Sequence, residues 1–88
     1  MDIEKSYYGE YKTNNGNAIT ISIKDLKLYF SYDTIVAFYI KGELTVRKNE
    51  WGSTTGKHLN WIDGGTKESR IDGVEFLVKL SKAIEENI

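Results

Sequence analysis

Apolar and polar side chains alternate with a period of two over much of the first half of the chain. Isoleucines occupy positions 19, 21 and 23 with polar residues between them, and residues 26–32 repeat the pattern. On one face the second segment places Leu26, Leu28, Phe30 and Tyr32. This period is typical of half-buried strands, and Lys24-Asp25 between the two segments predicts a short hairpin turn.

Three further segments complete a predicted antiparallel meander. Residues 34–40, TIVAFYI, form a β-branched and aromatic run, which indicates a central strand covered on both faces. Lys41-Gly42 then turns the chain into a strand over residues 43–48. Near the N-terminus, Tyr7, Gly9 and Tyr11 share one face of a strand that ends at the turn-rich residues 14–17. We therefore expect four or five antiparallel strands.

The C-terminal residues change to the helical period. Asp72 with Glu75 has the spacing of a capping box, so a helix is predicted from there to about Glu86. Its apolar face comprises Val74, Leu77, Leu80, Ile84 and Ile88, widened by Phe76 and Val78. Its polar stripe comprises Glu75, Lys79, Lys82 and Glu86. The predicted fold is therefore an α+β domain over residues 1–88, with this amphipathic helix packed on one sheet face.

A short helix is predicted between the sheet and the final helix. It covers about residues 55–62, with a hydroxyl residue among positions 53–55 as its cap, Leu59 and Ile62 facing inward, and Gly64-Gly65 at its end. Gly56 weakens this helix by about 1 kcal/mol relative to alanine. We expect an unusual backbone geometry or the close approach of another group to explain this glycine.

Length and composition exclude several classes of protein. Eighty-eight residues suffice for one domain, and the absence of cysteine excludes disulfides and thiolate metal sites. The longest apolar run, residues 35–40, is too short to cross a bilayer, and the N-terminus lacks the layout of a signal peptide. We expect a cytoplasmic protein without membrane contact. The formal net charge is −1, but residues 47–70 hold five basic and three acidic side chains, the only net positive segment.

Unusual chemistry gathers in that basic segment. The stretch WGSTTGKHLNWIDGG contains both tryptophans and the single histidine. The residues predicted to bind an anion or a partner are Trp51, Ser53, Thr54, Thr55, Gly56, Lys57, His58, Asn60, Lys67 and Arg70. Hydroxyls, a glycine and a lysine at a helix start suit a phosphate group, although the order does not match a Walker A loop. The alternative is an ordinary capped helix with a solvated lysine.

Catalytic and metal-binding chemistry is less well specified. His58 is the residue with which any acid–base mechanism would begin, with Ser53 and Asp63 or Glu50 as conceivable partners, but a packing role is the commoner one for a lone histidine. No metal site and no cofactor is predicted, because one histidine without cysteine or an aspartate-rich loop makes no ligand set. The tryptophans suit base stacking or a partner interface as well as a core.

A second candidate surface lies on the sheet. If the helices cover only one face, the other face carries Lys27, Tyr29, Thr45 and Arg47. This mixture of basic and aromatic side chains suits nucleic acid or protein.

The middle of the chain resembles a small uncharacterised protein family found among phages, archaeal viruses and prokaryotic genomes. The resemblance rests on SYDTIVAF, a following asparagine and tryptophan, and TTGKHLN at residues 54–60. Gly52 departs from the small hydroxyl residue expected after the tryptophan. The resemblance implies an accessory protein of mobile elements acting in the host cytoplasm, with no established activity to transfer.

Three functions follow as hypotheses. The leading one is a non-enzymatic binding module, an anti-defence protein such as an anti-CRISPR-type inhibitor, that binds a protein or a protein–nucleic acid complex stoichiometrically. The second is a binder of nucleotide or nucleic-acid phosphate, or a small phosphotransfer or hydrolytic enzyme, that uses Lys57 and His58. The third is a homodimer or larger homo-oligomer with a structural role, suggested by the small core and a free edge strand.

Overall fold

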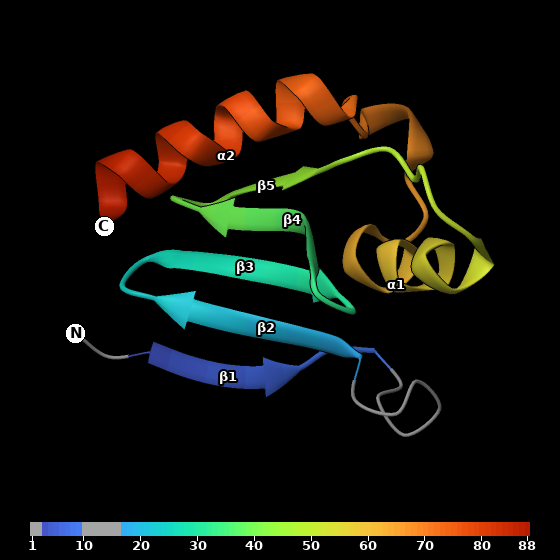
Figure 1. The fold of residues 1–88 in the computed structure, drawn as a ribbon, viewed down its shortest axis with the longest axis horizontal. Coiled ribbons are helices and arrows are strands. Elements are labelled where there is room, and N and C mark those ends of the chain that lie inside the picture. The colour runs from blue at the N-terminus through green and yellow to red at the C-terminus, as the bar shows by residue number, and fades with distance from the viewer. Residues whose placement is uncertain (1–2, 10–16) are drawn as a thin grey trace.

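A five-stranded antiparallel sheet and two α-helices make up the fold of the computed structural model, which describes residues 3–9 and 17–88 (Figure 1). The strands are β1 (Ile3–Tyr7), β2 (Ala18–Ile23), β3 (Leu26–Ser31), β4 (Thr34–Ile40) and β5 (Glu43–Val46), paired in that order. They are followed by α1 (Ser53–Asp63), the 3-10 helix η2 (Lys67–Ser69) and α2 (Gly73–Asn87). The predicted α+β class and the meander are confirmed. None of the helices in the described part of the chain is long and apolar enough to span a membrane.

Strand ends differ from the prediction at three places, the first being that the strand predicted over residues 43–48 ends at Val46. Lys24-Asp25 and Lys41-Gly42 form the expected hairpin turns. Tyr32, however, lies in the turn between β3 and β4 with φ 58°, so it does not continue the face of Leu26 and Leu28. Gly9 has φ 65° and lies beyond β1, so the predicted strand through it is wrong, because a left-handed residue cannot continue a strand. Tyr11 and the predicted turn at 14–16 lie outside the described residues.

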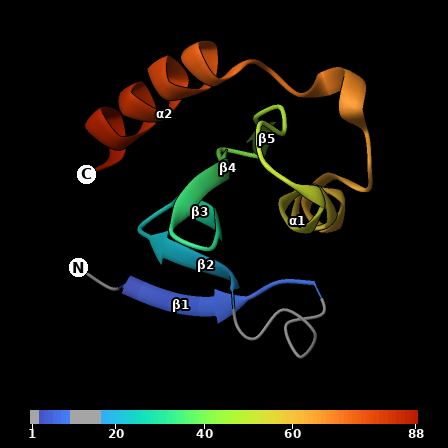
Figure 2. The same cartoon turned by 45° about the vertical axis from the view of Figure 1, so that its right-hand side comes forward.

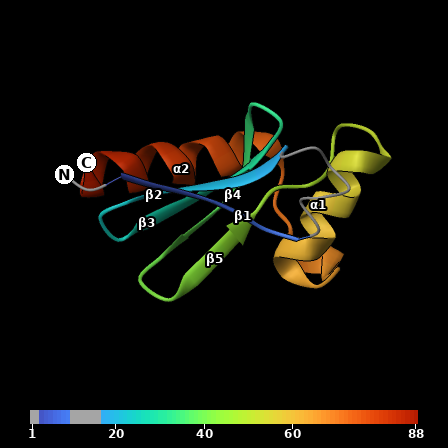
Figure 3. The same ribbon diagram turned by 90° about the horizontal axis from the view of Figure 1, so that it is seen from below.

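The two helices cover opposite faces of the sheet. Paired residues alternate between the faces, so Leu28 and Phe38 point to one face while Tyr29 and Ala37 point to the other. On the first face the core consists of Leu26, Leu28, Phe38, Phe76, Leu80 and Ala83, and therefore involves α2. On the second face it consists of Val36, Ala37, Val46 and Leu59, and therefore involves α1. The β4 strand is thus covered on both faces, as predicted, with α1 at one end of the sheet (Figures 2 and 3).

The buried face of α2 is not centred where its apolar pattern suggested. Phe76, Leu80 and Ala83 are buried, whereas Val74 is 77% exposed and Leu77, Val78 and Ile88 also face outward. The apolar face of this helix is wider than the strip that contacts the sheet. The periodicity therefore predicts more buried residues than the structure has. The start of the helix agrees with the prediction, because Asp72 Oδ1 accepts a hydrogen bond from the Glu75 N–H at 2.9 Å.

A buried arginine joins the start of α2 to the loop after β5. Arg47 forms a parallel bridge with Ile71, and its guanidinium carbon lies 4.8 Å from the Trp51 ring centroid and 5.4 Å from that of Phe76. Its Nη2 donates to Glu50 at 2.7 Å. Gly73 leaves room for this side chain, since a Cβ there would overlap it. The loop at residues 48–52 is therefore held in place before α1 begins.

Candidate functional site

Helix α1 begins without the cap that its sequence predicts. The N-cap residue is Gly52, which has no side chain with which to cap the helix, and Ser53, Thr54 and Thr55 already lie inside the first turn. The prediction of a hydroxyl cap is wrong because the helix starts earlier than residue 55. The predicted end is confirmed, since Gly64 has φ 72° and its N–H donates to the Asn60 carbonyl at 2.8 Å.

Gly56 is explained by the close approach of a loop side chain. A Cβ at this position would lie 3.1 Å from Nδ2 of Asn49. Asn49 itself donates to the Gly52 carbonyl at 3.2 Å and accepts from the Trp51 N–H at 2.9 Å. The missing side chain therefore lets the amide that shapes the 49–52 turn rest directly against α1, which agrees with one of the two predicted explanations.

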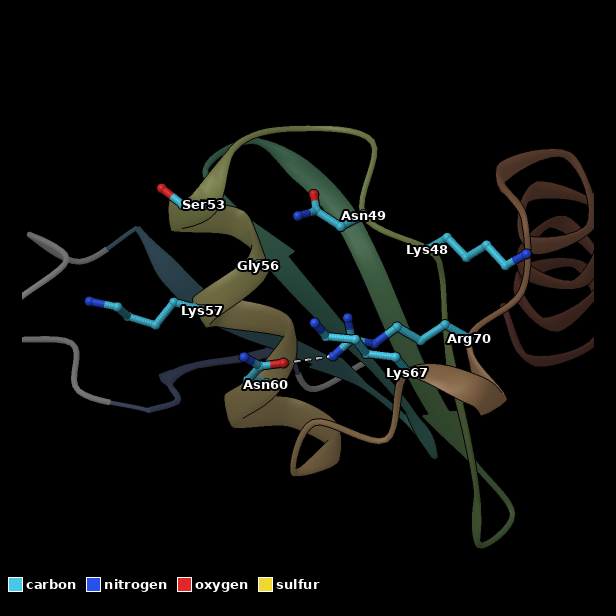
Figure 4. A pocket seen from close by; sticks show the side chains of 8 residues that line it. All are labelled: Lys48, Asn49, Ser53, Gly56, Lys57, Asn60, Lys67 and Arg70. Carbon is cyan, nitrogen blue, oxygen red and sulfur yellow. Dashed lines mark hydrogen bonds between the residues drawn. The ribbon is translucent and has the colours of Figure 1, made fainter.

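A cleft of about 600 Å³ lies beside α1 and is rich in cationic side chains (Figure 4). Its lining, which we call the cationic cleft, is Lys48, Asn49, Ser53, Gly56, Lys57, Asn60, Lys67 and Arg70. Lys67 and Arg70 extend toward α1, and Lys48 and Lys57 point to opposite sides of the cleft. Six of these residues belong to the set predicted from sequence. Lys48 and Asn49 were missed, although their position at the edge of the basic segment was a usable signal.

Arg70 is the structural member of the cleft. It is buried, and it donates from Nε and Nη2 to the two carboxylate oxygens of Asp63 at 2.7 and 2.9 Å, and from Nη2 to Asn60 Oδ1 at 3.0 Å. Burial alone would raise the pKa of Asp63, but the hydrogen bonds from Arg70 and the Gly65 N–H outweigh it, and the pKa is lowered. The pair ties the segment after η2 to the end of α1, and its charges cancel.

The three lysines keep their charge available. Within residues 3–9 and 17–88, the ion pairs are Arg47–Glu50, Arg70–Asp63 and Lys79–Glu75, so none includes Lys48, Lys57 or Lys67. All three lysines are exposed. Among the residues that the structure describes, no carboxylate lines the cleft. Three unpaired amines around one hollow surface produce a local positive potential on a chain of net charge −1.

His58 lies on the other side of α1, away from the cleft. It is fully buried, its Nδ1 is hydrogen-bonded to Ser31 Oγ at 2.7 Å, and Ser31 Oγ is 3.0 Å from Thr55 Oγ1. Among the described residues, Nε2 has no hydrogen-bond partner. Aromatic rings surround the imidazole, with Trp61 stacked at 5.5 Å between centroids and Tyr8 and Tyr32 at 6.2 and 5.8 Å. His58 therefore anchors α1 to β3.

The free energy of unfolding is expected to fall as the pH drops below about 6.5, the ordinary pKa of histidine. Burial, and then the charge of Lys57, lowers the pKa of His58 in the folded state. Below that pH the unfolded chain therefore binds a proton that the folded chain does not bind. The free energy of unfolding changes by at most about 1.4 kcal/mol per pH unit. Urea unfolding measured between about pH 5.5 and 7.5 tests this, because the sequence has one histidine. A His58→Gln variant should lack the slope, and a flat wild-type profile would contradict the burial of His58.

The remaining predicted residues are dispersed. Trp51 is 43% exposed beside Arg47, whereas Trp61 is half-buried, with Gly9 so close that a Cβ there would overlap the indole. Thr54 is exposed but does not line the cleft. The described residues contain no group of three or more His, Asp or Glu side chains close enough together to hold a metal ion.

The second candidate surface does not exist as one patch. Lys27 Nζ lies 5.3 Å from the Tyr29 ring centroid, so these two residues do form a pair. Thr45 pairs with Phe38 and therefore belongs to the α2 face, and Arg47 is buried. The predicted grouping assumed that both helices cover the same face, whereas they cover opposite ones.

Residues 1–78 match the model of a family of unknown function, DUF8033, and the chain therefore belongs to that family. Comparison with curated proteins and with solved structures yields no match. The family description assigns no activity, and the geometry of the cleft is therefore the basis for a function.

Proposed function

We propose that this protein is a small binding module whose cationic cleft holds the phosphate groups of a nucleotide or nucleic acid. The observation that carries the proposal is that Lys48, Lys57 and Lys67 line one cleft and that, among the described residues, no carboxylate lines it. The cleft volume of about 600 Å³ lies within the usual range for ligand sites, about 300–1,000 Å³. Phosphate oxygens are strong acceptors for lysine amines and for the amides of Asn49 and Asn60.

The spacing of the cations favours an extended polyanion. Lys48 and Lys57 point to opposite sides of the cleft, with Lys67 between them (Figure 4). A single phosphate would be surrounded by converging amines, whereas a chain of phosphates is met by amines distributed along its path. The arrangement therefore supports a nucleic-acid backbone more than a small anion.

Binding, as distinct from catalysis, is supported by the position of the histidine. Lys57 and His58 are neighbours in sequence, but on the helix they lie on different sides, and His58 has no exposed surface. A phosphotransfer or hydrolytic mechanism based on this pair would need both groups at the ligand. The described lining of the cleft offers lysines and amides for holding phosphate and no imidazole or carboxylate for moving a proton.

Salt dependence tests the proposal directly. A fluorescein-labelled oligonucleotide of roughly 12 nucleotides is titrated with the protein, and anisotropy is recorded between about 50 and 200 mM salt. Three lysine–phosphate contacts predict a slope of log K against log [salt] of about −2 on a single strand. The absence of binding at the lowest salt, or an affinity that does not change with salt, would contradict the proposal.

The role as a stoichiometric inhibitor of a protein or a protein–nucleic acid complex stays a second candidate. The exposed Trp51 beside the cleft favours it, since tryptophan is enriched in partner interfaces. Affinity capture from the natural host, with and without nuclease treatment, separates the two, because capture that survives nuclease indicates a protein partner. Light scattering of the purified chain decides whether it is a monomer or a homodimer.

A further inference from the structure

A second hollow, with an aromatic rim, also lies at the start of α1. It has a volume of about 240 Å³ and includes Ser31, Tyr32, Asp33, Trp51 and Thr55, which we call the aromatic pocket. Trp51 and Thr55 alternate along the chain with Ser53 and Gly56 of the cleft. The two linings have no residue in common among the described residues, but each takes two residues from positions 51–56 at the start of α1, the aromatic pocket on the side of His58 and the cleft on the other side.

Both aromatic rings of this pocket are exposed and held in position. Tyr32 is 50% exposed although its backbone has φ 58°, an unusual conformation for an aromatic residue. Its N–H donates to the Asn17 carbonyl at 2.8 Å, and its ring lies against His58. Trp51 is backed by the buried guanidinium of Arg47. Two ordered rings open to solvent offer stacking surfaces at little cost in conformational entropy.

The polar groups of the pocket suit the edge of a nucleobase. Asp33 at the rim is exposed and accepts hydrogen bonds, as the amino and imino N–H groups of bases require. Ser31 and Thr55 are buried members of the lining, and their hydroxyls lie 3.0 Å apart. Two exposed aromatic rings and an acceptor at the rim suit the face and the polar edge of one base.

We infer that the aromatic pocket takes an unstacked nucleobase of the strand whose phosphates lie in the cationic cleft, so that the ligand is single-stranded nucleic acid. This inference rests on the proposed function and names its ligand class. In a duplex the bases are stacked and paired, so a base could reach the pocket only after it left the helix. Stacking against aromatic side chains tolerates all four bases, so the expected binding shows little sequence preference.

Three probes of equal strand length test the inference at one salt concentration: a single strand of roughly 12 nucleotides, a fully abasic strand with the same number of phosphates, and the duplex, which carries twice as many. The wild-type protein is expected to bind the single strand about 5- to 150-fold more tightly than the abasic strand, the range for one stacked base. In a Trp61→Phe background, Trp51 is the remaining tryptophan, and its emission should be quenched by the single strand and left unchanged by the abasic strand.

Variants add an independent comparison. Trp51→Ala and Tyr32→Ala should reduce the preference for the single strand over the abasic strand, while Trp51→Phe should retain most of it. Tyr39→Ala is the matched control, because Tyr39 is also exposed but lies near the opposite end of β4. Equal binding of all three probes by the wild-type protein would overturn the inference and leave the phosphate cleft standing. Failure of every probe to bind would overturn both.

Discussion

The double charge reversal Lys57→Glu with Lys67→Glu is expected to weaken binding of a single-stranded oligonucleotide by more than about 100-fold. Charge-assisted hydrogen bonds contribute about 1.5–3 kcal/mol each, so the loss of two exceeds the equivalent of two decades in Kd. The glutamates add repulsion of the phosphates. Both lysines are exposed and form no ion pair in the described residues, so the fold should tolerate the change. Anisotropy titration measures the affinity, and circular dichroism checks folding.

A charge-matched control separates a local site from a general effect of net charge. Lys24 and Lys41 lie in the hairpin turns at the end of the sheet away from α1 (Figure 1). Lys24→Glu with Lys41→Glu changes the net charge by the same amount and should alter the affinity by less than about threefold, since exposed charges beyond the Debye length are screened. If this control weakens binding as much as the cleft variant, the cleft is not the binding surface.

The substitution Phe76→Ala is expected to lower the free energy of unfolding by about 3–5 kcal/mol. Phe76 is fully buried, its ring centroid lies 5.6 Å from that of Phe38, and the Arg47 guanidinium rests on it. Removal of the ring leaves a cavity between α2 and the sheet. It also removes one of the two aromatic contacts of the buried Arg47 guanidinium. In a domain of this size each kcal/mol corresponds to about 4–8 °C in Tm, so a fall of at least about 12 °C is expected.

The neighbouring residue supplies the control for this experiment. Leu77 is exposed on the outer side of α2, so Leu77→Ala should cost less than about 0.5 kcal/mol. Urea unfolding of the two variants, with unchanged m-values, measures the difference. Comparable losses of unfolding free energy at both positions would mean that α2 does not turn Phe76 alone toward the sheet.

Local patterns in the chain were sufficient to predict the order of the strands and of the two α-helices, but not the 3-10 helix η2. The alternation over residues 18–46 marks three of the strands, and Asp72 with Glu75 marks the start of α2. These features depend on residues that are two to four positions apart, so they can be predicted directly from the sequence. The cationic cleft was partly predictable for the same reason, because most of its residues belong to one basic segment.

Contacts between distant segments decided the rest. The sequence does not say that α1 and α2 cover opposite faces, that Phe76 rather than Leu77 is buried, or that Arg47 is enclosed by two rings. The sequence also does not show whether Lys57 or His58 is the buried residue. Adjacent residues on a helix point in different directions, and only the packing of α1 against β3 decides which of the two is buried. The sequence thus determined the strands, the helices and the position of the basic segment. The tertiary structure decided which side chains of that segment are exposed on the same surface. The reason is that folding reduces the exposed apolar surface of the whole chain and not that of each element separately.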